Sequence, residues 1–206
     1  AFQPFGSQQC HIYKSNKNHL FWMGLTDEEL IKGCNSGDRQ AQKMLYAKFS
    51  SQMYSVCLRY AKEQQLAEDI LQDSFIKVFD GLKNFKGESK LVYWIKRIVI
   101  NTALNAQRNK LYLYPMVDVD TLKETHVEEL SVSDFSMEEL LKMINELPSG
   151  CKVIFNLYAI EGYKHQEIAK MLGVTEGTAK SQYARAKFLL MEQMKQVMPG
   201  IKMRHK

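Results

Sequence analysis

Residues that interrupt helices are scarce in this sequence. Only 4 of the 206 residues are proline, and the stretch from position 5 to position 114 contains none. Because proline removes a helical hydrogen bond and clashes with the preceding turn, so long a gap favours helices. The alternation of apolar and polar residues that a strand needs occurs only at 117–120 (VDVD). No apolar run of about 18 residues occurs either, so we expect no membrane insertion.

Cysteine is scarce as well, and its spacing fits no familiar site. The four cysteines stand at positions 10, 34, 57 and 151, and no two of them form a CxxC pair. Zinc sites and disulfide frameworks need characteristic spacings that these positions do not have. We therefore expect reduced thiols, a cytoplasmic protein, and neither a metal ion nor another cofactor.

The short motifs of common enzyme sites are missing too. The five histidines are scattered, and neither HExxH nor a phosphate-binding P-loop occurs. His165 lies at an expected helix start, where a surface role is more typical than that of a catalytic base. An enzyme is therefore the least favoured class of protein, and we expect no catalytic residue.

What the sequence does contain is an uneven distribution of charge. The net charge of +5 is mild, but eight basic residues and only two acidic ones lie between 77 and 110. Between 115 and 139 the balance reverses, with eight acidic residues against Lys123 alone. A basic block beside an acidic block indicates a surface that binds a polyanion, next to a solvated or polyanion-mimicking segment.

Apolar residues recur at helical spacing through most of the N-terminal half. Spacings of three and four predict amphipathic helices over 39–60, 66–82 and 91–110, and the composition of 84–89 (NFKGES) predicts a loop. A further helix is expected to begin after Thr26, which is a suitable N-cap and is followed by three carboxylates in the first turn.

An acidic segment separates these helices from the C-terminal part. Residues 111–136 have weak periodicity and contain a proline, so we expect a flexible linker there. Helical periodicity resumes at Met137, stops at Pro148, and returns in a helix that ends near Gly162. The sequence therefore predicts an all-α protein with two helical domains joined by an acidic flexible linker.

The segment 167–190 (EIAKMLGVTEGTAKSQYARAKFLL) has the pattern of a helix-turn-helix. Gly173 can adopt the left-handed conformation that ends a first helix, and Thr175 is a good N-cap for the second. One stripe of the second helix is apolar, whereas other faces carry polar and basic residues. Such a helix can pack by one face and enter the major groove by another. An ordinary helical hairpin with a solvated basic face would show the same pattern.

Aromatic rings are interleaved with cations around residue 90. Phe85, Tyr93 and Trp94 stand among four cations, Lys86, Lys90, Lys96 and Arg97. Rings that stack on unpaired bases and cations that hold phosphates are what a single-stranded nucleic acid site needs. Alternatively, the rings belong to the core and the lysines are solvated, and the helical spacing of Trp94 fits the core equally well.

An acidic patch precedes this block on the helix expected over 66–82. Asp69, Gln72 and Asp73 fall within about one turn and share an exposed face. That face can pair with a basic surface of a partner, or it can simply be solvated.

Three motifs, in this order and spacing, resemble a known family. AEDILQDSFIKVF (67–79), FKGES followed after four residues by tryptophan (85–94), and EIAKMLGVTEGTAKS (167–181) are similar to an extracytoplasmic-function (group 4) sigma factor of bacterial RNA polymerase. The resemblance covers residues 24 to about 195. It implies sigma region 2 at 24–110, a linker at 111–136 and sigma region 4 at 137–198. Outside these lie an N-terminal extension at 1–23, expected to be disordered, and a basic tail at 199–206.

The resemblance implies a site for the minus-ten promoter element in region 2. A base extruded from the DNA stack would meet Phe85 and Asn101, with Gly81 beside the pocket, while cations hold the strand by its phosphates. The implied residues are Gly81, Phe85, Lys86, Trp94, Lys96, Arg97, Asn101 and Arg108.

The resemblance also implies that the helix-turn-helix reads the minus-thirty-five element. The implied contacts are Thr178, Lys180, Ser181, Gln182 and Arg185. Many family members have arginine at the position of Gln182 and valine at that of Ala179, and Tyr183 replaces a typical aliphatic residue. Because a guanidinium contact is missing, we expect an unusual or weak preference at this element.

The implied partners are core RNA polymerase and promoter DNA, both duplex and single-stranded. Asp69, Gln72 and Asp73 match the region that binds the clamp helices of the largest polymerase subunit, and the flap is a second polymerase contact. An anti-sigma factor or another recruiting protein is a further expected partner. The leading hypothesis is a sigma factor that directs polymerase to promoters and melts the minus-ten element. The alternative is a free-standing helix-turn-helix regulator of duplex DNA, which gives no role to the aromatic and basic block.

Overall fold

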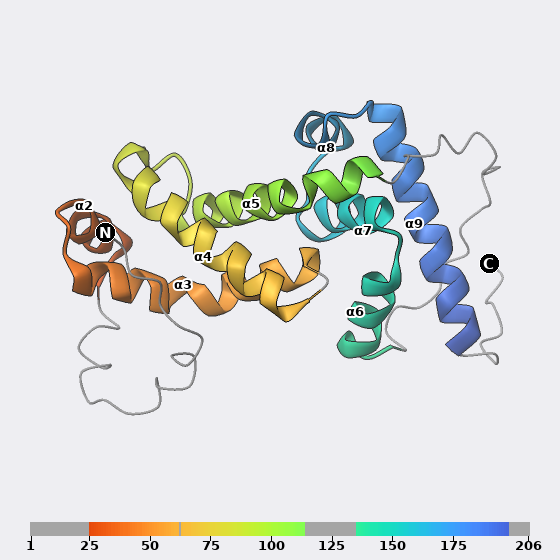
Figure 1. The fold of residues 1–206 in the computed structure, drawn as a ribbon, viewed down its shortest axis with the longest axis horizontal. Coiled ribbons are helices and arrows are strands. Elements are labelled where there is room, and N and C mark those ends of the chain that lie inside the picture. The colour runs from red at the N-terminus through yellow and green to blue at the C-terminus, as the bar shows by residue number, and fades with distance from the viewer. Residues whose placement is uncertain (1–24, 62, 114–134, 198–206) are drawn as a thin grey trace.

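The computed structural model describes residues 25–61, 63–113 and 135–197, and every element in these ranges is helical (Figure 1). The first domain contains α2 (Asp27–Asn35), α3 (Arg39–Tyr60), α4 (Gln64–Gly81), the short 3-10 helix η2 (Leu82–Asn84) and α5 (Leu91–Leu113). The second contains α6 (Met137–Glu146), α7 (Ser149–Phe155), η4 (Asn156–Ile160), α8 (His165–Leu172) and α9 (Glu176–Val197). This confirms the expected all-α fold with two helical domains.

Three of the expected segments fall outside the described ranges. They are the extension at 1–23, most of the acidic linker with its VDVD sequence, and the tail at 199–206. The helix α5 continues to Leu113, three residues past the end expected for it. Within the described ranges, no helix is both long and apolar enough to cross a membrane.

The N-terminal domain is a bundle in which α3, α4 and α5 pack against one another, with α2 against α3. The long helix α3 buries one stripe of side chains that recur at spacings of three and four. These are Leu45, Phe49, Met53, Val56, Cys57 and Tyr60. Residues of α5 complete the core from the other side, because Ile95, Val99 and Ala103 are fully buried at spacings of four. The apolar side chains whose spacing predicted these helices are therefore the ones that hold the helices together.

Each domain begins with a capping box. In α2, the backbone N–H of Glu29 donates to Oγ1 of Thr26, while the Glu29 carboxylate accepts from the backbone N–H of Thr26. Ser136 and Glu139 make the same reciprocal pair at the start of α6. Both helices thus satisfy two backbone donors at their N-termini locally. The expected cap at Thr26 is confirmed.

The C-terminal domain ends in the helix-turn-helix formed by α8 and α9. Gly173 has φ 68°, the left-handed conformation expected for it, and this lets the backbone N–H of Val174 donate to the carbonyl of Ala169. Thr175 then accepts from the backbone N–H of Thr178, as expected for an N-cap. The turn therefore depends on Gly173 and Thr175, the two residues from which the sequence predicted it.

The helix expected to end near Gly162 is not uniform. It begins as the α-helix α7 and continues as a π-helical turn over Asn156–Ile160, with Gly162 in a left-handed conformation just beyond. A π turn inserts one extra residue per turn and changes which side chains face inward. Here it places Asn156 and Leu157 inside and leaves Tyr158 and Ile160 exposed.

The two domains share one hydrophobic core. Val153, Ile154 and Leu157 of the second domain belong to the same buried cluster as the residues of α3, α4 and α5. The buried Asn156 also donates from Nδ2 to the carbonyl of Arg59 at 2.9 Å. Figure 1 shows the result as an elongated molecule, with α2 at one end and α6 and α9 at the other.

Candidate nucleic-acid interface

The loop and helix around residue 90 form an aromatic pair. The rings of Phe85 and Trp94 lie 5.3 Å apart between centroids with an interplanar angle of 57°. Both are half-buried against the core. A Cβ atom at Gly81 would lie 3.3 Å from two carbons of the Trp94 indole, so the glycine permits this close packing. The structure therefore brings Gly81, Phe85 and Trp94 together, as the sequence predicted.

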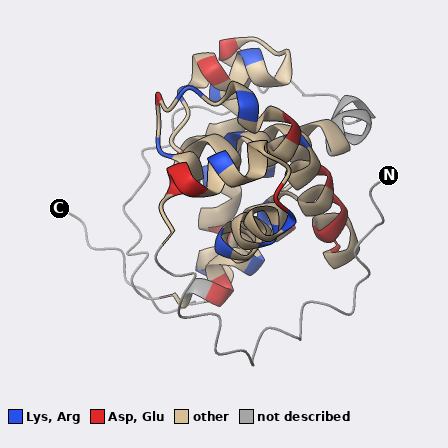
Figure 2. Cartoon of the chain, turned by 90° about the vertical axis from the view of Figure 1, so that its left-hand side faces the viewer, with Lys and Arg blue, Asp and Glu red and all other residues tan. Residues whose placement is uncertain are grey.

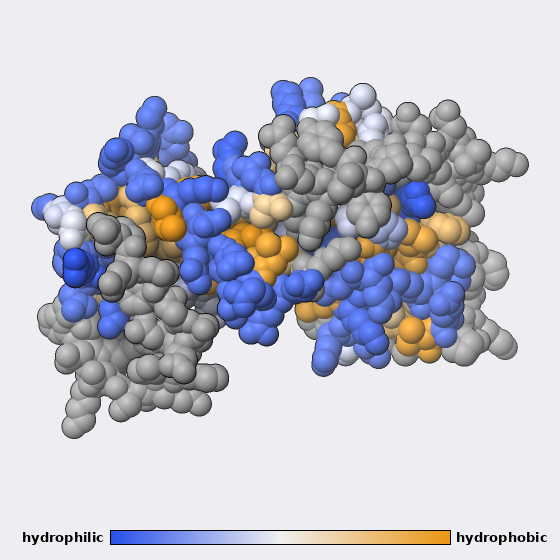
Figure 3. All heavy atoms as spheres, viewed as in Figure 1, coloured by the Kyte–Doolittle hydropathy of each residue, from blue (hydrophilic) through white to orange (hydrophobic). Residues whose placement is uncertain are grey.

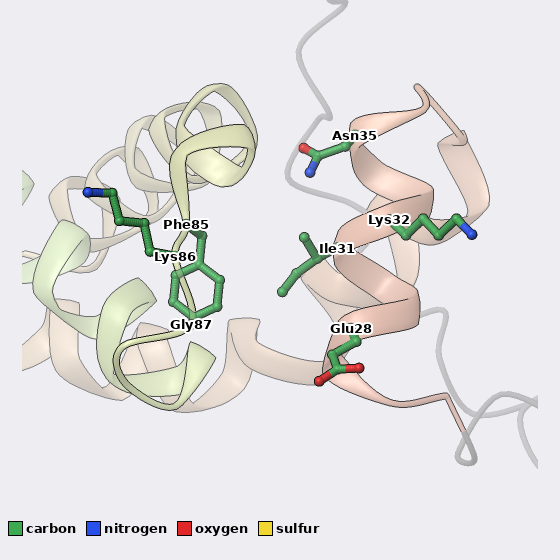
Figure 4. A pocket seen from close by; sticks show the side chains of 7 residues that line it. All are labelled: Glu28, Ile31, Lys32, Asn35, Phe85, Lys86 and Gly87. Atoms are coloured by element: carbon green, nitrogen blue, oxygen red, sulfur yellow. The ribbon is translucent and has the colours of Figure 1, made fainter.

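An open cavity of ≈ 470 Å³ lies in front of the Phe85 ring (Figure 4). Phe85 and Ile31 lie on opposite sides of it, with Ile31 directed toward the Phe85 side, and Asn35 and Glu28 of α2 line it beside Ile31. Lys86 and Gly87 belong to the same lining. The cavity thus has two apolar walls with an amide and a carboxylate nearby, a composition that suits one planar, polar-edged group.

The helix α5 presents its predicted DNA contacts on two different faces. Trp94, Arg97 and Asn101 are three and four residues apart and share one face, on which Arg97 and Asn101 are exposed. Lys96 stands two residues from Trp94 and points elsewhere, because residues two apart on a helix do not face the same way. Its ammonium group pairs with Glu161 of the C-terminal domain at 2.6 Å. Arg108 lies within α5, but its side chain is outside the described part of the structure.

Charge alone does not distinguish the surface around Phe85. Figure 2 shows both acidic and basic residues on the end of the molecule that faces the viewer. Figure 3 shows apolar residues gathered in separate patches between hydrophilic stretches on the face shown there. The Phe85 region combines rings, a cavity and exposed cations.

The acidic patch of α4 is exposed as expected. Asp69, Gln72 and Asp73 all face solvent on one side of the helix. Ile76 continues this side one turn later and is 51% exposed. The sequence reasoning missed Ile76, although an isoleucine three residues after Asp73, on a polar face, is a detectable signal. Together the four residues offer an apolar contact bordered by carboxylates.

On α9, most of the expected groove contacts are accessible. Lys180 is exposed and pairs within its own helix with Glu176 at 2.8 Å. Ser181 and Arg185 are half-buried, and the hydroxyl of Ser181 donates to the carbonyl of Thr178. The basic residues therefore remain on the outside of the helix-turn-helix.

Gln182 is an exception that corrects the sequence prediction. It is 4% exposed, and its amide oxygen accepts from the thiol of the buried Cys151 at 3.0 Å. It lies three residues after Ala179 and four before Ala186, both fully buried, so helix geometry turns it inward with them. In this conformation Gln182 does not face the groove.

Tyr183 belongs to an aromatic cluster between η4, α8 and α9. Its ring lies 4.5 Å from Tyr158, 5.6 Å from His165 and 6.0 Å from Phe155. Tyr158 and His165 are stacked at 4.2 Å. Burial, followed by the charge of Lys180, lowers the pKa of His165. His165 is thus a half-buried packing residue of the domain, whereas a surface role was expected for it.

Two family models match the chain. The model described as Sigma-70 region 2 matches residues 45–110, and the model described as Sigma-70, region 4 matches residues 137–188. An ECF RNA polymerase sigma-E factor of Salmonella typhimurium is 29% identical over 175 residues, which are 79% of this chain and 91% of the relative. This chain is an ECF sigma factor.

A further curated relative and a solved structure are also similar to this sigma factor. The ECF RNA polymerase sigma-E factor of Haemophilus influenzae is 27% identical over 188 residues, 84% of this chain and 98% of the relative. A solved structure of the sigma factor RpoE with the anti-sigma factor NepR from Bartonella quintana matches at 20% identity with a TM-score of 0.49, over 74% of this chain and 96% of that one.

Membership of the family settles two of the earlier alternatives. A sigma factor is a transcription initiation factor with a DNA-binding helix-turn-helix and has no enzymatic activity. The match to region 2 also accounts for the N-terminal domain, which the alternative of a free-standing regulator would leave without a role. The predicted family, function class and absence of catalysis are therefore confirmed.

Proposed function

We propose that this sigma factor holds the minus-ten element on its N-terminal domain and the minus-thirty-five element on its C-terminal domain. Region 2 would occupy 24–110 and region 4 would occupy 137–198, with the acidic linker at 111–136 between them. The observation that carries the proposal is the Phe85–Trp94 pair beside an open cavity and exposed cations. Such a site receives an unpaired base and its strand.

The captured base would enter the cavity between Phe85 and Ile31. The Phe85 ring already packs against Trp94, so its accessible surface is the one that borders the cavity. Stacking there offsets the loss of stacking within the DNA, and the amide of Asn35 is available to the polar edge of the base. Lys86, in the lining of the same cavity, would hold the adjoining phosphate.

Asn101 would contact a different nucleotide of the same strand. It lies seven residues, or about 10 Å, along α5 from Trp94 on the same face. Arg97 is exposed between them and would hold the intervening backbone. Arg108, further along α5, is proposed as a phosphate contact on the family resemblance alone.

Region 4 would read the minus-thirty-five element with the outer face of α9. Lys180 and Arg185 would contact phosphates or base edges, and Thr178 and Ser181 would add hydroxyl contacts near the start of the helix. Gln182 is left out of this set because it is buried and bonded to Cys151. The exposed contacts are few, which supports a weak preference at this element.

Core RNA polymerase would bind the exposed face of α4. Asp69, Gln72 and Asp73 would pair with a basic surface of the clamp helices, and Ile76 would supply the apolar centre of the contact. The flap would bind region 4, and an anti-sigma factor or recruiting protein is expected from the family resemblance. A protein that works on polymerase and promoter DNA acts in the cytoplasm, and the acidic linker would imitate RNA near the active centre.

The test is transcription in vitro with bacterial core RNA polymerase free of other sigma factors. The purified chain, core enzyme and genomic DNA fragments are combined, and the 5′ ends of the RNA are mapped. Discrete start sites that need the chain support the proposal and identify both promoter elements. Absence of such starts, when the chain binds core enzyme in a separate assay, would contradict the promoter-reading role.

A further inference from the structure

Three consecutive carboxylates open α2, and the middle one lines the cavity in front of Phe85. Asp27 pairs with a lysine of α3 at 2.7 Å, and Glu29 belongs to the capping box. Glu28 is exposed and borders the cavity, and within the described residues its carboxylate has neither an ion pair nor a hydrogen bond. A carboxylate in a first turn stabilises its helix without needing a partner, so Glu28 remains available to a molecule in the cavity.

Glu28 shares its face of α2 with Ile31 and Asn35. Positions three and seven residues further along a helix lie on one side, and the rise of the helix spreads this row over about 10 Å. Figure 4 shows Ile31 and Asn35 directed toward the Phe85 side of the cavity, with Glu28 at the other end of the row. An apolar side chain therefore stands between two polar ones, which fits the flat face and the polar edges of a base.

The two cations of the lining are directed elsewhere. In Figure 4, Lys86 extends from the loop away from Ile31, and Lys32 extends from α2 away from the Phe85 side. A phosphate group would be attracted to these ammonium groups and repelled by the carboxylate of Glu28. The backbone of a bound strand therefore belongs at Lys86, and the row on α2 faces the uncharged base.

We propose that Glu28 selects the captured base, and that it accepts a base with an exocyclic amine and rejects thymine. The inference rests on the proposed capture of a base between Phe85 and Ile31. An ionised carboxylate only accepts hydrogen bonds, so it needs an N–H group on the edge of the base. Cytosine, adenine and guanine each offer an amine, and glutamate is a known partner of the cytosine N4 amine. Thymine has a single N–H between two carbonyl oxygens, which repel the carboxylate.

Asn35 completes the recognition from the other end of the row. Its amide contains both a donor and an acceptor, so it can pair with a carbonyl oxygen or a ring nitrogen of any base. Within the described residues this side chain has no hydrogen-bond partner, and the amide can turn to suit the base. Glu28 is therefore the selecting residue, and Asn35 orients the base without deciding which one is bound.

The test compares two strands that differ at the edge of each base. One strand contains 12 deoxycytidines and the other 12 deoxyuridines, so their lengths and charges are equal. In deoxyuridine an oxygen replaces the N4 amine, and the adjacent ring nitrogen carries a hydrogen. Both strands compete with one fluorescent strand for the full chain at pH 7.5, and the ratio of their affinities is measured. We expect the unaltered chain to bind the deoxycytidine strand at least about fivefold more tightly.

Three variants assign this preference to the carboxylate. Glu28→Gln should reduce the ratio to within about twofold, because an amide can accept from the amine or donate to the carbonyl. Glu28→Asp keeps the carboxylate and should keep the preference for deoxycytidine. Glu63→Gln is the matched control, since it makes the same charge change at an exposed residue before α4 and should leave the ratio unchanged. Each ratio compares two strands on one protein, so the effect of the lost charge cancels.

A second measurement uses the holoenzyme on a promoter found by start-site mapping. Each base pair of its minus-ten element is replaced in turn, so that the non-template strand carries thymine or cytosine. At one position, thymine should reduce transcription about fivefold relative to cytosine. Glu28→Gln should reduce this difference to within about twofold at that position and leave the preferences at the other positions unchanged.

Two results would overturn selection by Glu28. One is equal binding of both strands by the unaltered chain, and the other is a preference for deoxycytidine that survives Glu28→Gln. Either result would leave the proposed function in place if the unaltered chain gives promoter-dependent starts in the transcription assay. Failure of both strands to bind would instead contradict base capture, and the selection with it.

Discussion

Asn101 is an exposed amide on the face of α5 that also carries Trp94 and Arg97. An amide offers both a donor and an acceptor, so it can recognise the edge of an unpaired base. We predict that Asn101→Ala weakens discrimination of the minus-ten sequence by about 1–3 kcal/mol. Start-site mapping on a promoter and its minus-ten variants measures this.

Asn105→Ala is the matched control for Asn101→Ala. Asn105 is exposed on the next turn of the same helix and has no proposed DNA contact. It should leave start-site selection unchanged, and both variants should bind core polymerase as the unaltered chain does. Equal loss of core binding and promoter selection by Asn101→Ala would rule out a base contact.

Because of Cys57, we expect the stability of the N-terminal domain to depend on pH in the alkaline range. Burial raises the pKa of its thiol from 9.0 to about 12. Above pH 9 the unfolded chain loses this proton while the folded chain retains it, so the folded state is stabilised below pH 9 and loses that advantage as pH rises toward 12. We predict that Cys57→Ala reduces the fall in unfolding free energy over this interval by up to about 1.4 kcal/mol per pH unit. Urea unfolding at pH 8, 10 and 11 measures it, and parallel curves for both proteins would contradict the assignment.

Gln182 shows where reasoning from sequence reached its limit at this scale. The apolar stripe on α9 was recognised from Ala179, Tyr183 and Ala186, and Gln182 lies on the same side of the helix. Its polarity suggested solvent, whereas a thiol from Cys151 satisfies its amide oxygen inside the domain. That partner is 31 residues away, and no local pattern announces such a contact.

At the scale of elements, the turn between α8 and α9 depends on Gly173. A side chain in the left-handed conformation costs about 1–2 kcal/mol, so Gly173→Ala should lower the free energy of unfolding by that amount. Gly177 makes a matched control, because it lies in the first turn of α9 and a Cβ there meets nothing closer than 3.7 Å. Gly177→Ala should leave stability unchanged or raise it by up to about 1 kcal/mol. Chemical unfolding compares the two, and equal effects would argue against a conformational requirement at Gly173.

The polar face of α4 provides the prediction for polymerase binding. Reversing its charge with Asp69→Lys and Asp73→Lys should weaken association with core polymerase severalfold, more so at low salt, because the proposed partner surface is basic. Glu63→Lys is the control, since Glu63 is exposed at the start of α4 and lies on another face. Surface-immobilised core enzyme reports the affinities. Unchanged binding by the doubly reversed chain would remove α4 from the interface.

The positions of the helices were largely predictable, but the form of one was not. Spacings of three and four located α3, α4, α5 and the helix-turn-helix because each helix buries a continuous stripe. The same rule predicted an unbroken helix up to Gly162, where the structure has a π turn. The π turn contacts the end of α3, because Asn156 donates a hydrogen bond to the carbonyl of Arg59. Local periodicity contains no information about such a contact with the other domain.

For the whole molecule, the shared core predicts joint unfolding. Because residues of both domains form one buried cluster, thermal unfolding of the free chain should occur in a single transition by every probe. Glu161→Lys should separate it into two, since each domain then unfolds alone. Calorimetry with domain-resolved hydrogen exchange measures this. Two transitions in the unaltered chain would indicate that the junction contributes little to stability.

The docking of the domains was the part of the fold least accessible from sequence. Two helical domains followed from the helical periodicity and the acidic segment. Their association includes the ion pairs of the Glu161 carboxylate with Arg59 and Lys96, which are 102 and 65 residues away. Each of these charged residues taken alone looks like ordinary solvated surface. The pairing emerges only from the assembled molecule.

The capping boxes at Thr26 and Ser136 have a consequence for how such a gene can change. The first helix of each domain is capped by a box of four residues, and the hydrogen bonds of this box involve no residue further upstream. Sequence inserted before either signal, or exchanged between relatives there, leaves the first helix of the following domain with its N-terminus already satisfied. Recombination at these two points therefore keeps the first helix of each domain capped, whereas the residues of the shared core and the ion pairs of Glu161 still have to match across the junction.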